Sequence, residues 1–251
     1  MKSIKMTYKK IYSMIYNLMF SNKLRRRRKI LACLALGAGI MVGTVILLIN
    51  YFNPDVYFLY WGPWDNTTCH YIETDVTLPR ADAREFNPPA KSIFFHETSC
   101  SGTLNSRQAC SVESAARAHP DWQINVLFAA PVTHYALKTG AISVIKNLTN
   151  IKLTRVHIGK YAKGTPLESM VSGGALNRTR WRISHSSDVL RYLSLYKFGG
   201  VYLDLDVVVV KSFDSLEKNW GARAADIWVE AGAISFSRDE VGRELADAAI
   251  T

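Results

Sequence analysis

The sequence predicts an α/β domain with a mainly parallel sheet, carried behind a single membrane-spanning helix near the N-terminus. From residue 91 onward, segments with strand-like alternation take turns with segments of helical periodicity, which is typical of βαβ units. Residues 30–49 are twenty uncharged residues, enough to cross a bilayer as a helix. A chain of 251 residues that is 48% hydrophobic fits one ordinary domain with appendages.

The excess positive charge of the chain is confined to its first 29 residues. The formal net charge is +10, and ten of the 31 Lys and Arg residues lie in this tail, which contains no acid. The remainder therefore balances 21 cations with 21 acids. Because nucleic-acid binding needs a basic face on the folded domain, we expect no nucleic-acid partner.

The run Arg-Arg-Arg-Arg-Lys at residues 25–29 precedes the apolar segment and orients it. By the positive-inside rule, residues 1–29 are a cytoplasmic tail and residues 30–49 a signal anchor. A nuclear-localisation signal is the alternative for the basic run, but the apolar segment that follows favours an anchor. Gly39 and Gly43 form a G-x-x-x-G pattern that can pack two membrane helices into a homo-oligomer. Glycine that is simply common in membrane spans explains the same pattern.

Two further features suit a lumenal location for everything after residue 50. Three N-x-S/T sequons follow the span, at Asn66, Asn147 and Asn177, and none precedes it. An oxidising lumen also permits disulfides. Cys100 and Cys110 are ten residues apart and are predicted to pair, which leaves Cys69 without a partner.

The first half of the domain follows a lumenal stem predicted at residues 50–90, where prolines and aromatics show little periodicity. Residues 92–99 form a short apolar strand. A helix then begins at Asn105 or Ser106, which can cap it, and stops at Pro120. The next predicted elements are a strand at 123–131, a helix-like stretch at 132–148, a strand at 151–158 and an irregular segment that follows it.

The second half contains a predicted helix at 186–198 and a strand at 201–210. Ser186 or Ser187 can cap the helix, and Gly199-Gly200 ends it, because glycine enters the left-handed conformation cheaply. The strand continues into valines on both faces, which is typical of a central, doubly covered strand.

Asp204 and Asp206 interrupt this apolar strand. Side chains alternate along a strand, so both carboxylates face the same way as Tyr202. Two like charges side by side in apolar surroundings are unfavourable unless a divalent cation lies between them. Oxygen ligands suit Mn²⁺ or Mg²⁺, which can hold a diphosphate at the same time. An exposed strand face is the alternative, since a lone D-x-D is common by chance.

Asp188 and Arg191 lie three residues apart on one face of the preceding helix. Arg191 is a natural donor to Asp188, to a phosphate or to a sugar hydroxyl. A surface ion pair of little energetic weight is the alternative. The Gly-Gly turn brings this helix back to the strand that carries Asp204 and Asp206.

The residues SDVLRYLSLYKFGGVYLDLD resemble the nucleotide-sugar-binding core of DXD glycosyltransferases with a GT-A fold. Together with IFFHETSC, LNSRQACSVESAA and AGAISFS, they resemble the alpha-1,4-glycosyltransferase family from about residue 92 to the end of the chain. The resemblance implies a GT-A-like, Rossmann-like domain at 91–251. It also implies a Golgi type II membrane protein that uses a UDP-sugar and Mn²⁺ (or Mg²⁺) with retention at the anomeric carbon.

The resemblance also assigns roles to individual residues. Asp204 and Asp206 match the family's metal and diphosphate motif, and thus its catalytic centre. Asp188 and Arg191 match positions that hold the donor sugar and ribose. His96 and Thr98 match the start of the nucleotide pocket, although an ordinary half-buried histidine is the alternative for His96.

Members of that family continue with a second region that helps to form the acceptor site, and nothing here resembles it. We therefore expect the C-terminal part of the domain to be missing.

The first hypothesis is transfer of galactose or N-acetylgalactosamine from UDP to a glycolipid or glycan. The second is a non-catalytic, membrane-anchored homologue that binds a UDP-sugar or pairs with an active enzyme. A hydrolase or nucleotide kinase is disfavoured, because the motifs G-x-x-x-x-G-K-[ST], H-E-x-x-H and G-x-S-x-G are missing from the sequence.

Overall fold

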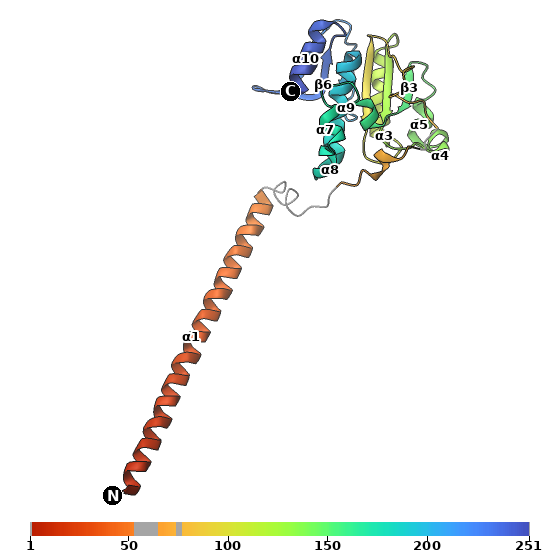
Figure 1. Cartoon of the computed structure of the whole chain (residues 1–251). Helices are drawn as coiled ribbons and strands as arrows, with labels where there is room; N and C mark the ends of the chain where they lie inside the picture. The colour runs from red at the N-terminus through yellow and green to blue at the C-terminus, as the bar shows by residue number, and fades with distance from the viewer. Residues whose placement is uncertain (1, 53–64, 74–76, 251) are drawn as a thin grey trace. The chain divides into compact units, whose positions relative to one another are not determined.

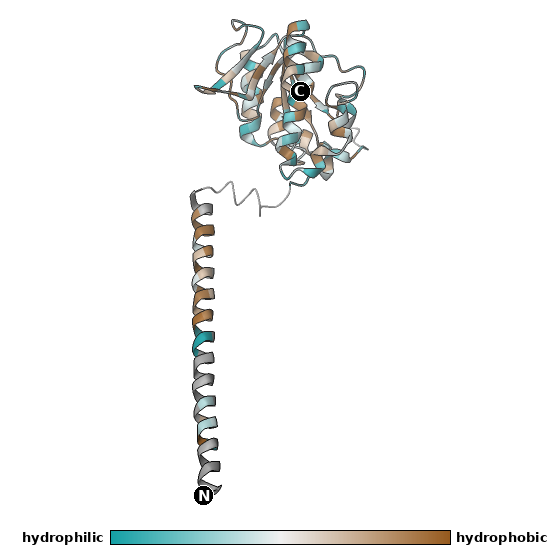
Figure 2. Ribbon diagram, turned by 60° about the vertical axis from the view of Figure 1, so that its left-hand side comes forward, coloured by the Kyte–Doolittle hydropathy of each residue, from teal (hydrophilic) through white to brown (hydrophobic). Residues whose placement is uncertain are grey.

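The computed structural model describes residues 2–52, 65–73 and 77–250, and it contains two compact units, Met1–Pro63 and Trp64–Thr251 (Figure 1). The first unit is built from one helix, α1 (Lys2–Phe52). Within it, Lys29–Leu48 is long and apolar enough to cross a membrane, judged by length and composition, with a mean hydropathy of 2.5. Figure 2 shows the apolar residues gathered along this part of α1. The predicted apolar helix is present, and its insertion into a membrane stays a prediction.

The second unit is organised around a six-stranded mixed sheet in the order β3-β2-β1-β4-β6-β5. Neighbours from β3 to β4 pair in parallel, whereas β6 is antiparallel to both β4 and β5. The α/β fold class and the mainly parallel sheet are therefore confirmed. The strands are β1 (Ser92–Glu97), β2 (Gln123–Phe128), β3 (Ile151–Arg155), β4 (Gly200–Leu203), β5 (Trp220–Ala225) and β6 (Trp228–Phe236).

Helices cover both faces of this sheet (Figure 1). On one face α3 and α5 pack on Ile93 and Phe95 of β1, and on the other α6 and α9 pack on Phe94 and on Tyr202 of β4. Alternate residues of β1 thus serve two separate cores, which is why the strand reads as a continuous apolar run. The helices of this unit are α3 (Ser106–Ala118), α4 (His134–Lys138), α5 (Gly140–Ile145), α6 (Ile158–Tyr161), α7 (Glu168–Ser172), α8 (Ala175–Arg178), α9 (Arg182–Phe198) and α10 (Glu240–Ile250).

The N-terminus of α3 is closed by a reciprocal cap. The Asn105 side chain accepts hydrogen bonds from the backbone N–H groups of Arg107 and Gln108. In return, the backbone N–H of Asn105 donates to the Gln108 side chain at 2.9 Å. This arrangement satisfies helix-end donors that would otherwise need water. The predicted cap at Asn105 is confirmed.

The helix before the D-x-D sequence is longer than predicted. α9 begins at Arg182 with Trp181 as its N-cap residue, so Ser186 and Ser187 lie inside the helix and do not cap it. Ser186 is buried and so lies on the side of the helix that faces the fold. The predicted C-terminal turn is confirmed, since Gly199 and Gly200 have φ angles of +64° and +97°.

Gly200 also permits close packing of β4 on β1. A Cβ atom at this position would lie 2.6 Å from the carbonyl oxygen of Ser92. Only glycine avoids both that clash and the strain of a positive φ angle. The Gly-Gly pair therefore ends α9 and aligns β4 in one turn.

The predicted strand at 201–210 is wrong beyond Leu203, where β4 ends. Val208 and Val210 are 55% and 86% exposed, so this valine run is no doubly covered strand. The loop lies on α3 instead: the Ser111 hydroxyl donates to the carbonyl of Val207, and the N–H of Val209 donates to the Ser114 hydroxyl at 2.9 Å. These side chains satisfy backbone groups that a strand would have paired.

Two predicted segments are more finely divided than the sequence suggested. The helix-like stretch at 132–148 contains two short helices, α4 and α5, separated at Thr139 where Gly140 takes a φ angle of +65°. The segment expected to be irregular contains α7 and α8. Both outcomes reflect local turn geometry that residue patterns encode poorly.

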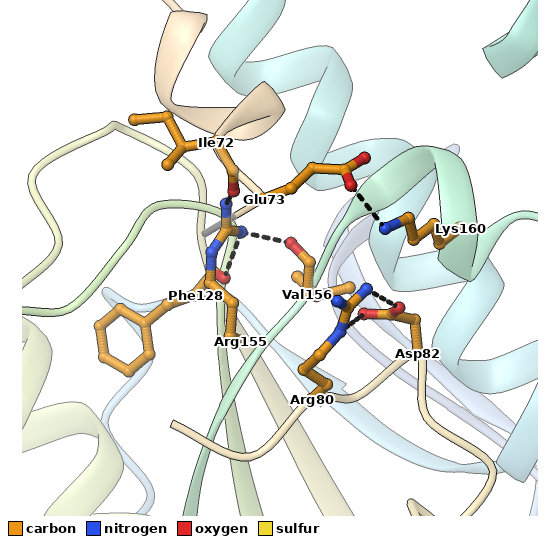
Figure 3. Close-up of polar contacts among 8 residues, drawn as sticks. All are labelled: Ile72, Glu73, Arg80, Asp82, Phe128, Arg155, Val156 and Lys160. Atoms are coloured by element: carbon orange, nitrogen blue, oxygen red, sulfur yellow. Dashed lines mark hydrogen bonds and ion pairs between the residues drawn. The ribbon is translucent and has the colours of Figure 1, made fainter. Parts of the chain in front are cut away.

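Much of the sequence predicted as stem packs on the α/β unit. A short 3-10 helix, η1 (Thr68–Tyr71), is held by the fully buried guanidinium of Arg155, which donates to the carbonyls of Cys69 and Ile72. Arg155 also donates to the carbonyls of Phe128 and Val156 (Figure 3). Because a buried cation needs several acceptors, these contacts fix residues 69–72 against the ends of β2 and β3.

The disulfide predicted between Cys100 and Cys110 is wrong. Cys100 is bonded to Cys69, with 5.5 Å between their Cα atoms, and Cys110 is a free, exposed thiol on α3. Ala109 and Val112 occupy the buried face of α3, so the Cys110 side chain is directed toward solvent. Cys69 reaches Cys100 because η1 lies beside the end of β1, where the His70 ring is bonded to the carbonyl of Thr98.

Candidate functional site

The candidate site lies where the strand order of the sheet reverses. From β1 the chain proceeds outward to β2 and β3, whereas β4 pairs with the other side of β1. At such a point the loops after adjacent strands diverge and leave a crevice at the carboxyl ends. An open groove of about 380 Å³ occurs here, lined by His96, Asn105, Arg107, Gln108, Ser187, Tyr202, Asp204, Leu205 and Asp206.

On one side of the groove, the side chains are joined by ion pairs and hydrogen bonds. A guanidinium nitrogen of Arg191 lies 3.1 Å from a carboxylate oxygen of Asp188 and 3.3 Å from one of Asp204. The same guanidinium lies 4.7 Å from the centre of the Tyr202 ring, a cation–π geometry. Only 10% of the Arg191 side chain is exposed, so these contacts are little screened by water. We call His96, Asp188, Arg191, Tyr202 and Asp204 the closed side.

The hydroxyl of Tyr202 orients Asp204. It donates to the Asp204 Oδ1 atom at 2.5 Å and lies 3.0 Å from the Ser187 hydroxyl. Burial, reduced in effect by the charge of Arg191, raises the pKa of Tyr202, so the phenol stays protonated and remains a donor. The backbone N–H of Asp204 donates to the carbonyl of Gly232 on β6 at 2.7 Å.

Gly232 supplies the space beside the second carboxylate oxygen of Asp204. A Cβ atom on Gly232 would lie 2.8 Å from Asp204 Oδ2, closer than van der Waals contact allows. The antiparallel strand β6 therefore approaches the carboxylate with backbone alone. This oxygen is the one left over after Oδ1 has bonded Tyr202 and Arg191.

The other side of the groove is charged but unpaired, and we call Arg107 and Asp206 the open side. Both side chains are exposed, and neither forms a hydrogen bond or ion pair with any residue in the described ranges. Asp206 is carried by the loop that Ser111 and Ser114 hold on α3, and Arg107 lies in the first turn of that helix. The groove thus presents a free carboxylate and a free guanidinium from neighbouring elements.

His96 lines the groove as a neutral group. Its Nε2 atom lies 3.1 Å from the Ser194 hydroxyl, and its ring centre lies 5.1 Å from that of Tyr202. Burial, together with the nearby charge of Arg191, lowers the pKa of His96 to about 3. The imidazole therefore offers hydrogen bonds without charge at neutral pH.

The sequence-predicted site residues are partly brought together. Asp204, Asp206 and His96 line the groove, and Asp188 and Arg191 reach it through Asp204. Thr98 is not among the lining residues. Its hydroxyl donates to the carbonyl of Ile183 at 3.1 Å and its own carbonyl is bonded to His70, so it ties β1 to α9 and η1.

The groove fits a hard divalent cation. Asp206 offers an unpaired carboxylate, and Asp204 offers the oxygen beside the bare backbone of Gly232. Oxygen-only donors of this kind suit Mg²⁺ or Mn²⁺. Of the described histidine, cysteine and acidic residues, only Cys69, His70 and Cys100 cluster at metal-binding distance, and the two sulfurs there are bonded to each other.

A family comparison identifies this region of the chain. Residues 105–224, from the first turn of α3 through most of β5, match the glycosyltransferase sugar-binding region containing a DXD motif. The chain carries the sugar-binding region of the DXD glycosyltransferases. The predicted resemblance to these enzymes is therefore confirmed, and the D-x-D of the family is Asp204-Leu205-Asp206 here.

The chain is also similar to curated alpha-1,4-glycosyltransferases. It is 31% identical over 187 residues to lactosylceramide 4-alpha-galactosyltransferase of Mus musculus, covering 72% of this chain and 51% of that protein. It is 28% identical over 151 residues to alpha-1,4-N-acetylglucosaminyltransferase of Homo sapiens, covering 58% of this chain and 44% of that protein. The chain thus spans about half the length of the curated relatives it matches.

Among solved structures, the chain is similar to the PaToxG glycosyltransferase, with 19% identity, a TM-score of 0.44 and coverage of 65% of this chain and 60% of that one. It is also similar to the galactosyltransferase LgtC, with 17% identity and a TM-score of 0.32, covering 62% and 59%.

Sequence reasoning missed Arg107 and Gly232. Arg107 follows a helix-cap signal and gives no sign of lining a groove with Asp206, because the two residues lie about a hundred residues apart in the chain. Gly232 stands in AGAISFS, and a glycine inside a strand pattern does suggest close approach of another group. The sequon residues Asn66, Asn147 and Asn177 are all exposed, and their glycosylation stays a prediction.

Proposed function

We propose that this protein is a hexosyltransferase that transfers a sugar from a nucleotide diphosphate donor to a glycan or glycolipid. The observation that carries the proposal is the pair Asp204 and Asp206 at the strand-order reversal, inside a region that matches the DXD sugar-binding family. The donor proposed is UDP-galactose or UDP-N-acetylgalactosamine. The linkage proposed is alpha-1,4 with retention, because the curated relatives carry alpha-1,4 names.

The closed side would hold the sugar end of the donor. Arg191 is fixed by Asp188 and Asp204, so its remaining N–H groups are aimed without further loss of side-chain freedom. Asp188 is half exposed and can accept a sugar or ribose hydroxyl. Neutral His96 would add a hydrogen bond at the start of the pocket.

Asp204 and Asp206 would hold Mn²⁺ or Mg²⁺ together with the donor diphosphate. When bound, such a cation offsets the negative charge that develops on the departing diphosphate. Tyr202 holds Asp204 in one orientation throughout, because its buried phenol remains a donor. The bare backbone of Gly232 leaves Asp204 Oδ2 accessible.

Release of UDP from UDP-galactose tests this proposal directly. The full chain in detergent should release UDP when Mn²⁺ is present, and more slowly or not at all after chelation. Asp206→Ala should abolish the metal-dependent part. If Asp206→Ala releases UDP at the wild-type rate, the metal assignment is wrong.

The same assay separates the non-catalytic candidate. A wild-type chain that binds UDP with Mn²⁺ but releases none from UDP-galactose or UDP-N-acetylgalactosamine, with or without added acceptor, would act as a sugar-nucleotide-binding or enzyme-partner protein. A screen of both donors against lactosylceramide and soluble glycans then identifies the substrates.

A Golgi location with type II topology completes the proposal. It is supported by the apolar helix Lys29–Leu48 behind a basic run, and by exposed sequons in the second unit. Enzymatic removal of N-glycans should lower the apparent mass through Asn66, Asn147 or Asn177. A triple Asn→Gln variant is the control, and an unchanged mass for the wild type argues against a lumenal domain.

A further inference from the structure

Arg107 is an unpaired cation in a groove otherwise dominated by acids. Its side chain lines the same groove as Asp204 and Asp206 and makes no ion pair or hydrogen bond with any described residue. By contrast, Arg191 pairs with Asp188 and Asp204, and Arg117 on the same helix as Arg107 pairs with Glu113 at 2.7 Å. An arginine that stays unpaired beside a free carboxylate leaves room for a ligand between them.

The helix cap engages much of the backbone next to the Arg107 side chain. The N–H groups of Arg107 and Gln108 already donate to Asn105, and the N–H of Asn105 donates to Gln108. The guanidinium is therefore the free cationic donor that this end of α3 presents to the groove. Its planar set of N–H groups matches the oxygens of a phosphate.

Charge balance in the groove indicates which ligand suits this arrangement. Asp188 and Arg191 offset each other, and a divalent cation would offset Asp204 and Asp206. The negative charge of a bound diphosphate would then remain unbalanced. Arg107 supplies the opposing charge from α3, across from the loop that carries Asp206.

We infer that Arg107 binds the diphosphate of the nucleotide donor as a second cationic contact beside the metal carboxylates. This inference rests on the proposed function, since it needs a nucleotide diphosphate in the groove. It adds a residue outside the D-x-D sequence. It also makes affinity depend on the number of phosphates, since the contact involves the phosphate oxygens alone.

Binding of UDP, UMP and uridine to the full chain in detergent, with Mn²⁺ present, tests the inference. Arg107→Ala should weaken UDP binding about tenfold or more, the usual loss for a charge-assisted hydrogen bond. Uridine binding should stay within about twofold of wild type. Arg107→Lys should regain part of the UDP affinity, because it keeps the charge but loses the planar fork. Arg117→Ala, on the same helix, should match wild type for all three ligands.

The outcomes distinguish this inference from the proposed function. If Arg107→Ala binds UDP like wild type while Asp206→Ala does not, Arg107 has no role and the proposed function stands. Equal weakening of uridine and UDP would show a structural defect and overturn the inference. If wild type binds no UDP with Mn²⁺, both are wrong. Thermal unfolding of each variant, expected near wild type since Arg107 is exposed, excludes misfolding as the cause.

Discussion

The two sides of the groove differ in how they are prepared for a ligand. On the closed side Asp204 is bonded to Tyr202 and Arg191 before any ligand arrives. On the open side Asp206 and Arg107 have no partner in the described chain. The two carboxylates, only two residues apart, therefore have different surroundings. Asp204 is held by contacts within the fold, and Asp206 is exposed and available for the cation that we propose.

The largest effect is expected when each carboxylate is replaced by its amide. Asp204→Asn and Asp206→Asn should each weaken Mn²⁺-dependent UDP binding by about a thousandfold, since each removes a ligand charge. Only Asp204→Asn should also lower the unfolding temperature, because it alone removes the charge that pairs with Arg191 and weakens the hydrogen bond from Tyr202. Calorimetry of both variants measures the unfolding temperatures. Equal values would show that Asp204 contributes no more to stability than Asp206.

The disulfide next to the closed side gives the second test. Cys69–Cys100 closes a loop of 31 residues, for which loop-closure entropy predicts a loss of about 3.5 kcal/mol of unfolding free energy in Cys100→Ser. Cys110→Ser on α3 is the matched control and should change stability little, because Cys110 is exposed and unbonded. Similar destabilisation of Cys100→Ser and Cys110→Ser, with Cys69→Ser unaffected, would instead support the Cys100–Cys110 pairing expected from the sequence. Denaturant unfolding under non-reducing conditions measures each variant.

The closed side should also respond to pH through His96. The unfolded histidine takes up a proton below pH 6.5, whereas the folded one, with a pKa of about 3, does not. Stability therefore falls as pH drops below 6.5, by about 2 kcal/mol between pH 7 and pH 5 from this residue. In His96→Gln this loss of stability between pH 7 and pH 5 should be absent, so its unfolding temperature should depend less on pH than that of the wild type. His185→Gln, an exposed position on α9, should keep the wild-type slope. If the unfolding temperature of His96→Gln falls with pH as steeply as that of the wild type, burial of a neutral His96 does not cause the pH dependence.

The smallest expected effect concerns β6, the strand that lies beside Asp204. In Gly232→Ala the added methyl group meets Asp204 Oδ2, so the carboxylate must turn or β6 must shift. Mn²⁺-dependent UDP binding should fall about tenfold, with little change in uridine binding. Gly221→Ala on β5, where a Cβ meets the exposed Val229 side chain away from Asp204, is the control and should retain UDP affinity. Unchanged UDP affinity in Gly232→Ala would mean that Asp204 Oδ2 does not bind the cation.

The sequence was sufficient where a signal is local. Asn105 as the cap of α3 and Gly199-Gly200 as the end of α9 were both predictable, because capping and positive φ angles depend on a few adjacent residues. The alternation of strands and helices likewise predicted the α/β class. The D-x-D pair attracted attention because two acids were expected inside a buried strand. That reason is wrong, since β4 ends at Leu203 and Asp206 is exposed on the loop that follows.

The sequence was insufficient where a contact joins distant elements. The valines after Asp206 looked like strand, but α3 binds their backbone through Ser111 and Ser114. Cys69 was assigned to a stem, and its bond to Cys100 depends on Arg155 holding η1 in place. In each case tertiary hydrogen bonds outweighed the local pattern.

The position of β4 has a consequence for how the protein folds. This four-residue strand pairs with β1, about a hundred residues earlier in the chain, and with β6, which follows closely. Closing the long loop is entropically costly, so the pairing of β4 with β1 is expected among the slower steps of folding. Asp204 stands directly after that strand. We therefore expect the contacts of Asp204 with Arg191 and Tyr202 to form late, so a partly folded chain would lack the closed side of the groove.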